Sequence, residues 1–111
     1  MDIKRFIEDW LAASNAYDTD SYLDKYHKTA ELDDPSVGRI FKGHSGIKEY
    51  FEDYFIEYKT QTKLIRLEII HDNAAHIEVE FTGKFPEGRI GGVFDFTFKD
   101  DKIASVKAYL Q

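Results

Sequence analysis

The chain has 111 residues, no cysteine and a formal net charge of −6. This length predicts one domain spanning residues 1–111. The lack of cysteine excludes disulfides, thiolate metal sites and a cysteine nucleophile, and it fits the reducing cytoplasm, which is the expected location. The acidic balance, with Lys and Arg spread along the chain, argues against nucleic acid and anionic membranes as partners. No apolar stretch is long enough for a secretory signal or a membrane span.

The first half of the chain predicts helices and two short strands. Apolar residues at helical spacing predict a helix over residues 2–17, and an Asp-Thr-Asp sequence predicts the start of a second helix that ends near Tyr26. Residues 29–34 and 39–42 predict short strands separated by a Pro/Gly turn. A long amphipathic helix is expected after Gly43. Its apolar stripe is Ile47, Tyr50, Phe51, Tyr54, Phe55 and Tyr58.

The second half of the chain changes to a period of two. Apolar and polar residues alternate in four segments, which predicts strands with one buried face. These segments are residues 63–70, with Ile65, Leu67 and Ile69 as the apolar set, then 75–82, 94–98 and 103–110. A loop is expected over 86–92. Helices followed by antiparallel strands predict an α+β fold, with N-terminal helices packed on one face of a curved, mostly antiparallel sheet.

Asp34 is the candidate catalytic residue. It lies where the strand over residues 29–34 breaks into the turn that begins with Pro35. A carboxylate at a strand end above a hydrophobic chamber would lose water, which suits a general acid or base. The alternative is that Asp34 only shapes the turn, because Asp before Pro commonly initiates one.

Aromatic residues make up 15% of the chain, enough to line a cavity as well as fill a core. Trp10 lies on an apolar helix stripe and is either core or a pocket wall. The rings of the helix after Gly43 are mostly core by the same argument, although phenol oxygens at the edge of the stripe could orient a ligand. Tyr26 either hydrogen-bonds toward Asp34 or closes the pair of N-terminal helices.

The four histidines do not predict a metal site. They stand at positions 27, 44, 71 and 76, and their spacings match no compact metal motif. We therefore expect no metal. His76 alternates with Glu78 and Glu80 on the polar face of its strand, which predicts either a solvated or a dimer-forming sheet face.

The order of elements resembles the nuclear transport factor two-like superfamily, and within it the SnoaL-like and ketosteroid isomerase-like proteins. The similarity covers essentially the whole chain. It rests on the following residues: Trp10, Tyr26, Asp34-Pro35, Val37-Gly38, Gly43, Ile47, Tyr50-Phe51, the Phe-rich strand and the turn before Ile103. The resemblance implies a cone-shaped α+β barrel with a pocket between sheet and helices, and a homodimer through the outer sheet face. It implies fold more specifically than function, because related chemistries share this fold.

In the ketosteroid isomerases the general base is an Asp directly before Pro, and Asp34 matches that position. The match carries one extra residue before Gly38. The oxyanion-binding Tyr of those enzymes falls on Trp10, a supporting Tyr falls on Phe51, and the second acid falls near Phe94. The neighbouring Asp95 should face the other way. Of the phenol network only Tyr26 remains. The resemblance therefore implies a base without its oxyanion donors, which is not a typical ketosteroid isomerase.

Two functions follow as hypotheses. The first is cofactor-free isomerase, cyclase or lyase chemistry on a small hydrophobic or aromatic metabolite, with Asp34 as general acid or base. The second is a non-catalytic module for small-molecule binding or dimerisation. The candidate substrate-binding residues are Trp10, Tyr26, Phe51, Tyr54, Phe94 and Phe96.

Overall fold

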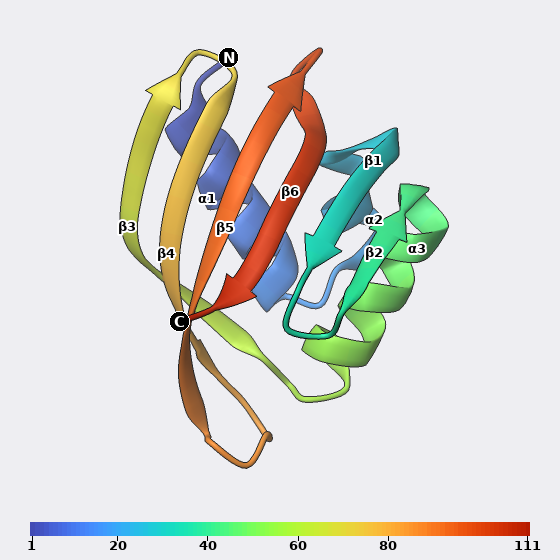
Figure 1. Cartoon of the computed structure of the whole chain (residues 1–111), viewed down its shortest axis with the longest axis vertical. Helices are drawn as coiled ribbons and strands as arrows, with labels where there is room; N and C mark the ends of the chain where they lie inside the picture. Colours follow the sequence, from blue (N-terminus) through green and yellow to red (C-terminus); the bar gives the residue numbers. More distant parts are fainter.

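The computed structural model describes residues 1–111 and places the helices on one face of a six-stranded sheet (Figure 1). The elements are α1 (Ile3–Asn15), α2 (Thr19–Asp24), β1 (Tyr26–Asp34), β2 (Arg39–Lys42), α3 (Gly43–Phe51), the π-helical segment η1 (Glu52–Ile56), β3 (Gln61–His71), β4 (Ala74–Thr82), β5 (Arg89–Lys99) and β6 (Lys102–Leu110). None of the helices has the length and hydropathy needed to cross a membrane.

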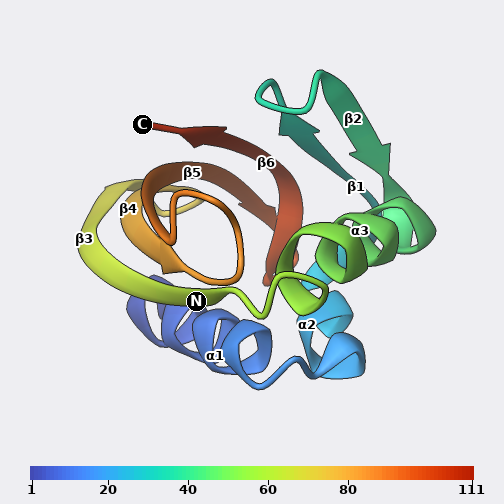
Figure 2. The same ribbon diagram turned by 90° about the horizontal axis from the view of Figure 1, so that it is seen from below.

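The sheet order is β2-β1-β6-β5-β4-β3. Every neighbouring pair is antiparallel except β1 and β6, which run parallel. This confirms the predicted α+β fold with a mostly antiparallel sheet. The sheet curves strongly around the helices but does not close into a barrel, because β2 and β3 remain as its two edges (Figure 2).

The N-terminal helices are shorter than predicted. Each begins at an aspartate cap: the Asp2 side chain accepts from the Arg5 backbone N–H, and the Asp18 side chain accepts from that of Ser21. Caps of this kind satisfy backbone donors that the first turn leaves free. The second helix ends at Asp24, so the prediction that it reaches Tyr26 is wrong. Tyr26 instead opens β1, where it pairs with β6.

The helix after Gly43 changes its hydrogen-bonding pattern at Glu52. It is α-helical to Phe51 and π-helical from Glu52 to Ile56. Thr60 closes its end, because the Thr60 backbone N–H donates to the Phe55 carbonyl at 2.8 Å and its hydroxyl donates to the Tyr54 carbonyl at 3.0 Å. Segments of π-helix inside α-helices often accompany functional sites.

Two strand predictions need correction. Ile65 and Ile69 were expected on the buried face of β3, but they are 57% and 53% exposed. Register shifts on either side of residues 65 and 70 interrupt the alternation, as β-bulges do. The loop expected over 86–92 ends earlier, because β5 already begins at Arg89. Residue 92, within β5, is a glycine because a Cβ at this position would come within 2.3 Å of the Phe81 ring.

An aromatic core fills the space between the helices and the sheet. We call it the Trp10 cluster; it comprises Trp10, Tyr22, Tyr26, Phe51, Phe94 and Phe96, all at most 2% exposed. The Trp10 ring meets the edges of Phe94 and Phe96 at 5.0 and 5.2 Å, and Tyr22 stacks on Phe51 at 4.0 Å. Such geometries are favourable for aromatic pairs and add to the burial of their apolar surface.

The outer face of the sheet is polar. Asp95 lies there, on the face opposite Phe94, as strand alternation predicts. Its carboxylate contacts His76 and accepts a hydrogen bond from the Tyr109 hydroxyl at 3.0 Å. Burial of the phenol and the Asp95 carboxylate beside it raise the pKa of Tyr109. Further out, Arg66 pairs with Glu78 at 2.9 Å.

Candidate functional site

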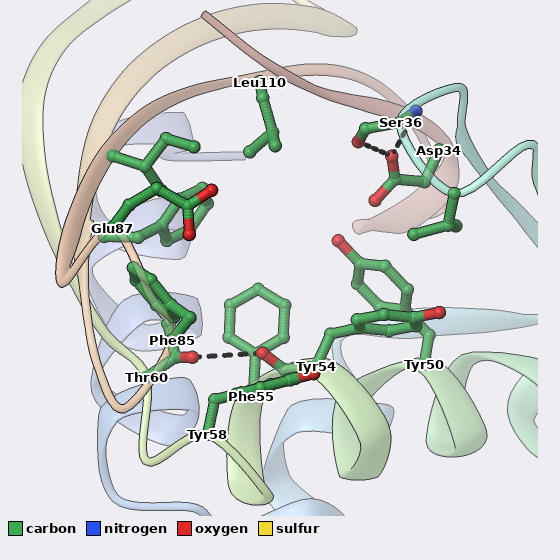
Figure 3. A pocket seen from close by; sticks show the side chains of 13 residues that line it. Asp34, Ser36, Tyr50, Tyr54, Phe55, Tyr58, Thr60, Phe85, Glu87 and Leu110 are labelled. Atoms are coloured by element: carbon green, nitrogen blue, oxygen red, sulfur yellow. Dashed lines mark hydrogen bonds between the residues drawn. The ribbon is translucent and has the colours of Figure 1, made fainter.

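A cavity of about 220 Å³ opens beside the C-terminal half of the long helix. Its walls come from four places: the turn after β1, the buried edge of α3 and η1, the loop between β4 and β5, and the last residue of β6 (Figure 3). Pockets for drug-sized ligands usually measure about 300–1,000 Å³, so this one suits a smaller molecule.

The floor and the rim of the cavity differ in composition. Tyr50, Phe55 and Phe81 form a buried aromatic floor. The half-exposed rings of Tyr54 and Tyr58 form part of the rim. Nine of the 13 lining residues are hydrophobic, so a ligand with an apolar body gains from burial here.

Asp34 lies at the edge of this cavity and is only 7% exposed. Its Oδ1 atom accepts hydrogen bonds from the backbone N–H of Ser36 at 3.0 Å and from the Ser36 hydroxyl. This turn fixes the plane of the carboxylate. Ser36 does not engage Oδ2, which points into the cavity beside the Tyr50 phenol (Figure 3). The turn therefore uses one carboxylate oxygen and leaves the other available to a ligand.

The Tyr50 phenol lies beside Asp34. Figure 3 shows its ring on the cavity floor with the hydroxyl directed toward the carboxylate. Burial raises the pKa of Tyr50 well above its usual value, and the Asp34 carboxylate raises it further. Tyr50 is therefore protonated at neutral pH and can donate one hydrogen bond into the cavity. A carboxylate acceptor and a phenol donor thus share one wall.

The loop between β4 and β5 is fastened to the end of the helix. The backbone N–H of Lys84 donates to the Tyr58 carbonyl at 2.7 Å, and the Phe85 ring meets the Tyr58 ring at 6.3 Å. This contact closes the ring of residues around the cavity. It also brings the exposed Glu87 to the rim, with its carboxylate facing the opening (Figure 3).

The structure separates the residues singled out from the sequence. Asp34 and Tyr54 line the cavity. The other five, Trp10, Tyr26, Phe51, Phe94 and Phe96, belong to the Trp10 cluster and are not among the cavity-lining residues. They pack against one another in the buried core between the helices and the sheet.

The hydroxyl of Tyr26 resolves one open alternative. It accepts a hydrogen bond from Trp10 Nε1 at 3.1 Å and donates to the Tyr22 hydroxyl at 2.8 Å. It therefore ties α1 and α2 to β1 and does not reach Asp34. Burial raises the pKa of Tyr26 to about 12, against the lowering effect of its hydrogen bonds with Tyr22 and Trp10.

Sequence reasoning missed most of the cavity wall. The sequence places Tyr50 in the apolar stripe of the helix, yet its hydroxyl faces Asp34. The available signal was that Tyr50 directly precedes Phe51, so the two side chains leave the helix in different directions. Glu87 and Phe85 lie in a loop whose path no periodicity indicates. Leu110 is the last strand residue, and only the sheet order brings it near Asp34.

No group of three or more His, Cys, Asp or Glu side chains is arranged to hold a metal ion. Asp34 and Glu87 stand at different places on the cavity wall, and neither belongs to a wider set of ligands. The cavity also lacks a glycine-rich phosphate cradle, because its only loop glycines flank the rim. The chemistry available from the described residues is acid–base and hydrogen-bonding chemistry.

Comparisons with known proteins agree with this architecture. The SnoaL-like domain family matches residues 7–106. Among solved structures, a protein described as a polyketide cyclase from Sinorhizobium meliloti aligns with a TM-score of 0.84 at 18% identity, covering 94% of this chain and 93% of that one. SalBIII, an epoxide hydrolase/cyclase-like enzyme with a role in pyran ring formation in the polyether salinomycin, aligns with a TM-score of 0.84 at 18% identity, covering 97% and 89%.

A protein with a ketosteroid isomerase-like fold from Catenulispora acidiphila, solved in complex with trimethylamine, aligns with a TM-score of 0.82 at 12% identity, covering 94% of this chain and 83% of that one. No curated protein sequence matches this chain significantly. Identities this low carry the fold alone, whereas the family match covers most of the chain. The chain therefore belongs to the SnoaL-like domain family.

Proposed function

We propose that the protein is a cofactor-free isomerase, cyclase or lyase in which Asp34 moves a proton on a small molecule held in the cavity. The observation that carries this proposal is the state of the Asp34 carboxylate. Ser36 holds Oδ1, while Oδ2 faces the cavity beside the Tyr50 phenol. A base must reach its proton directly, and a fixed, buried carboxylate oxygen meets that requirement.

Tyr50 supplies the hydrogen-bond donor that the sequence seemed to lack. The position that carries a supporting Tyr in ketosteroid isomerases is Phe51 here, and Phe51 stacks on Tyr22 in the core. One residue earlier, Tyr50 turns its phenol into the cavity. A single donor can orient a substrate, but it stabilises a developing oxyanion less than a pair would. The proposed chemistry is therefore proton transfer that does not depend on a strong oxyanion hole.

The test uses 5-nitrobenzisoxazole, a small neutral molecule whose N–O bond opens to give a coloured cyanophenolate when a base removes the proton on C3. We expect the wild-type protein to accelerate this reaction above acetate at equal concentration. Asp34→Asn should reduce the rate constant by about 10²–10⁴, the usual contribution of a positioned base.

The matched control is Asp33→Asn. Asp33 neighbours Asp34 on β1, but alternation turns its side chain to the other face of the sheet. This variant makes the same charge change and should retain the wild-type rate. Equal rates for wild type and Asp34→Asn would overturn the assignment of Asp34 as the base.

A non-catalytic binding module is the second candidate. The hydrogen bonds from Ser36 to Asp34 Oδ1 favour this candidate, because an Asp that only shapes a turn makes the same bonds. In that case Asp34→Asn leaves ligand affinity and the free energy of unfolding nearly unchanged. The Asp34→Asn variant therefore distinguishes the two functions when its reaction rate, its ligand affinity and its free energy of unfolding are all measured.

We also propose that two copies associate through the outer sheet face. The network of His76, Asp95 and Tyr109 and the Arg66–Glu78 pair give this face paired charges and hydrogen bonds. Light scattering coupled to gel filtration tests the proposal: a dimer supports it, and a monomer across the micromolar range overturns it.

A further inference from the structure

The charged side chains that line the cavity are all negative. Its lining includes the carboxylates of Asp34 and Glu87 but no Lys, Arg or His, although the chain carries 15 Lys and Arg residues. Neither carboxylate takes part in an ion pair within the protein. An anionic ligand would meet repulsion here, and a neutral one would leave both charges without a partner.

The charge of Asp34 is unusual because the residue is buried. A carboxylate that leaves water normally needs a counter-ion or several hydrogen bonds. Ser36 satisfies Oδ1 only, so Oδ2 faces the cavity with the neutral Tyr50 phenol beside it and no positive charge near it. A nine-tenths-buried carboxylate aimed into an empty volume points to a positively charged ligand group.

The aromatic walls suit the same ligand. The Tyr50 ring lies 5.5 Å from that of Tyr54 and 5.6 Å from that of Phe55, tilted by 42° and 55°. These tilted rings line a concave surface, together with the ring of Tyr58. The faces of aromatic rings attract cations, and cages of such rings recognise substituted ammonium groups.

We propose that the ligand of this cavity is a small organic cation, an amine or iminium ion with an apolar body. The positive nitrogen lies between Asp34 Oδ2 and the tyrosine rings, and Glu87 attracts the cation at the rim. The apolar body lies toward Phe81, Phe85 and Leu110. The cavity volume of about 220 Å³ limits the ligand to a small molecule.

This ligand class specifies the substrate of the proposed function. Its chemical consequence rests on that function, because it requires Asp34 to act as a base. When Asp34 removes a proton from a carbon next to a C=N⁺ group, the C–H bond breaks and its electron pair forms a C=C bond. The C=N π pair moves to nitrogen as a lone pair, and the proton resides on Oδ2. The product is a neutral enamine and a neutral acid. No oxyanion forms, so the reaction needs no oxyanion hole. Where the iminium ion also carries a β,γ C=C bond, the product is a dienamine, and Asp34 can return the proton to its γ-carbon, which shifts the double bond and completes an isomerisation.

The experiment compares choline with 3,3-dimethylbutan-1-ol, which has the same shape but carbon in place of the cationic nitrogen. Binding is measured by NMR titration of the full chain. We expect choline to bind at least about tenfold more tightly than the alcohol, because a desolvated cation–π contact alone reaches that size.

Two variants locate the effect. Glu87→Gln alters an exposed loop residue and should keep the fold while weakening choline binding severalfold. Asp34→Asn should bring choline and the alcohol to similar affinities, and thermal unfolding checks that this variant is folded. Asp33→Asn, with the same charge change on the other sheet face, should leave the preference for choline intact.

Equal or tighter binding of the alcohol by the wild-type protein overturns the inference. So does a preference for choline that survives in both Asp34→Asn and Glu87→Gln. Neither result touches the proposed proton transfer, which is measured with the neutral benzisoxazole. Conversely, a preference for choline combined with an inactive benzisoxazole assay retains the ligand class and removes the catalytic proposal.

Discussion

Two aromatic regions meet along α3: the Trp10 cluster and the cavity beside Asp34. Both are rich in Tyr and Phe, and the adjacent residues Phe51 and Tyr50 face one region each. In the cluster, the hydroxyls of Tyr22 and Tyr26 and the Trp10 N–H bond to one another. In the cavity, Asp34 Oδ2 and the Tyr50 hydroxyl lie beside each other and border the open volume. The comparison teaches that polar atoms on aromatic walls are structural where side chains enclose them and available for ligands where they border a cavity.

The largest test of this comparison truncates one phenylalanine in each region. Phe94→Ala should lower the free energy of unfolding by about 3–5 kcal/mol, because its ring is fully buried against Trp10 and Phe96. Phe85→Ala, on the cavity rim, should cost about 1 kcal/mol because the ring is only half-buried. Urea denaturation measures both. Similar losses would show that the rim is part of the same packing unit.

The next test removes one hydroxyl from each region. Tyr26→Phe should cost about 1–3 kcal/mol, because the buried Trp10 N–H loses its acceptor. Tyr50→Phe should cost less than about 1 kcal/mol, since its hydroxyl faces the cavity, but it should slow the benzisoxazole reaction. Stability and rate are measured on both variants. A stable, slow Tyr26→Phe protein would reverse the roles assigned to the two phenols.

The last test concerns alkaline pH. Tyr26 has a pKa of about 12 in the folded chain and about 10 when unfolded, so the folded state holds the proton more tightly. Its contribution to stability is complete below pH 10 and is lost as the pH rises toward 12. Between these values the free energy of unfolding should fall by about 1.4 kcal/mol per pH unit from this residue. Tyr26→Phe should show a shallower decline in urea titrations, and an equal slope would contradict the assignment.

The sequence predicts the fold better than the site, for physical reasons. Periodicity reports which face of an element is buried, so the helical stripe and the strand alternation place Phe51 and Phe94 inside. Periodicity does not report what the buried face contacts. Tyr50 and Phe51 look alike in the pattern, and only the direction of α3 across the sheet sends one toward Asp34 and the other toward Tyr22.

The errors within the fold are local and have the same origin. The bulges around Ile65 come from pairing with β4, which no local pattern records. The early start of β5 comes from the pairing of Arg89 and Ile90 with Thr82 and Phe81 of β4, which no local pattern records either. Asp34, in contrast, was found because the Asp-Pro turn is a local signal. The rim residue Glu87 lies in a loop, and no local sequence pattern indicates that this loop borders the cavity.

The loop over residues 83–88 gives the molecule a way to diversify. It contributes Phe85 and Glu87 to the cavity, yet it joins the rest of the chain mainly through its two strand ends and one backbone hydrogen bond to Tyr58. Loops of this kind accept insertions and substitutions more readily than the elements they connect. Descendants of this chain could therefore exchange one ligand for another by altering six residues, while the Trp10 cluster continues to fold as before.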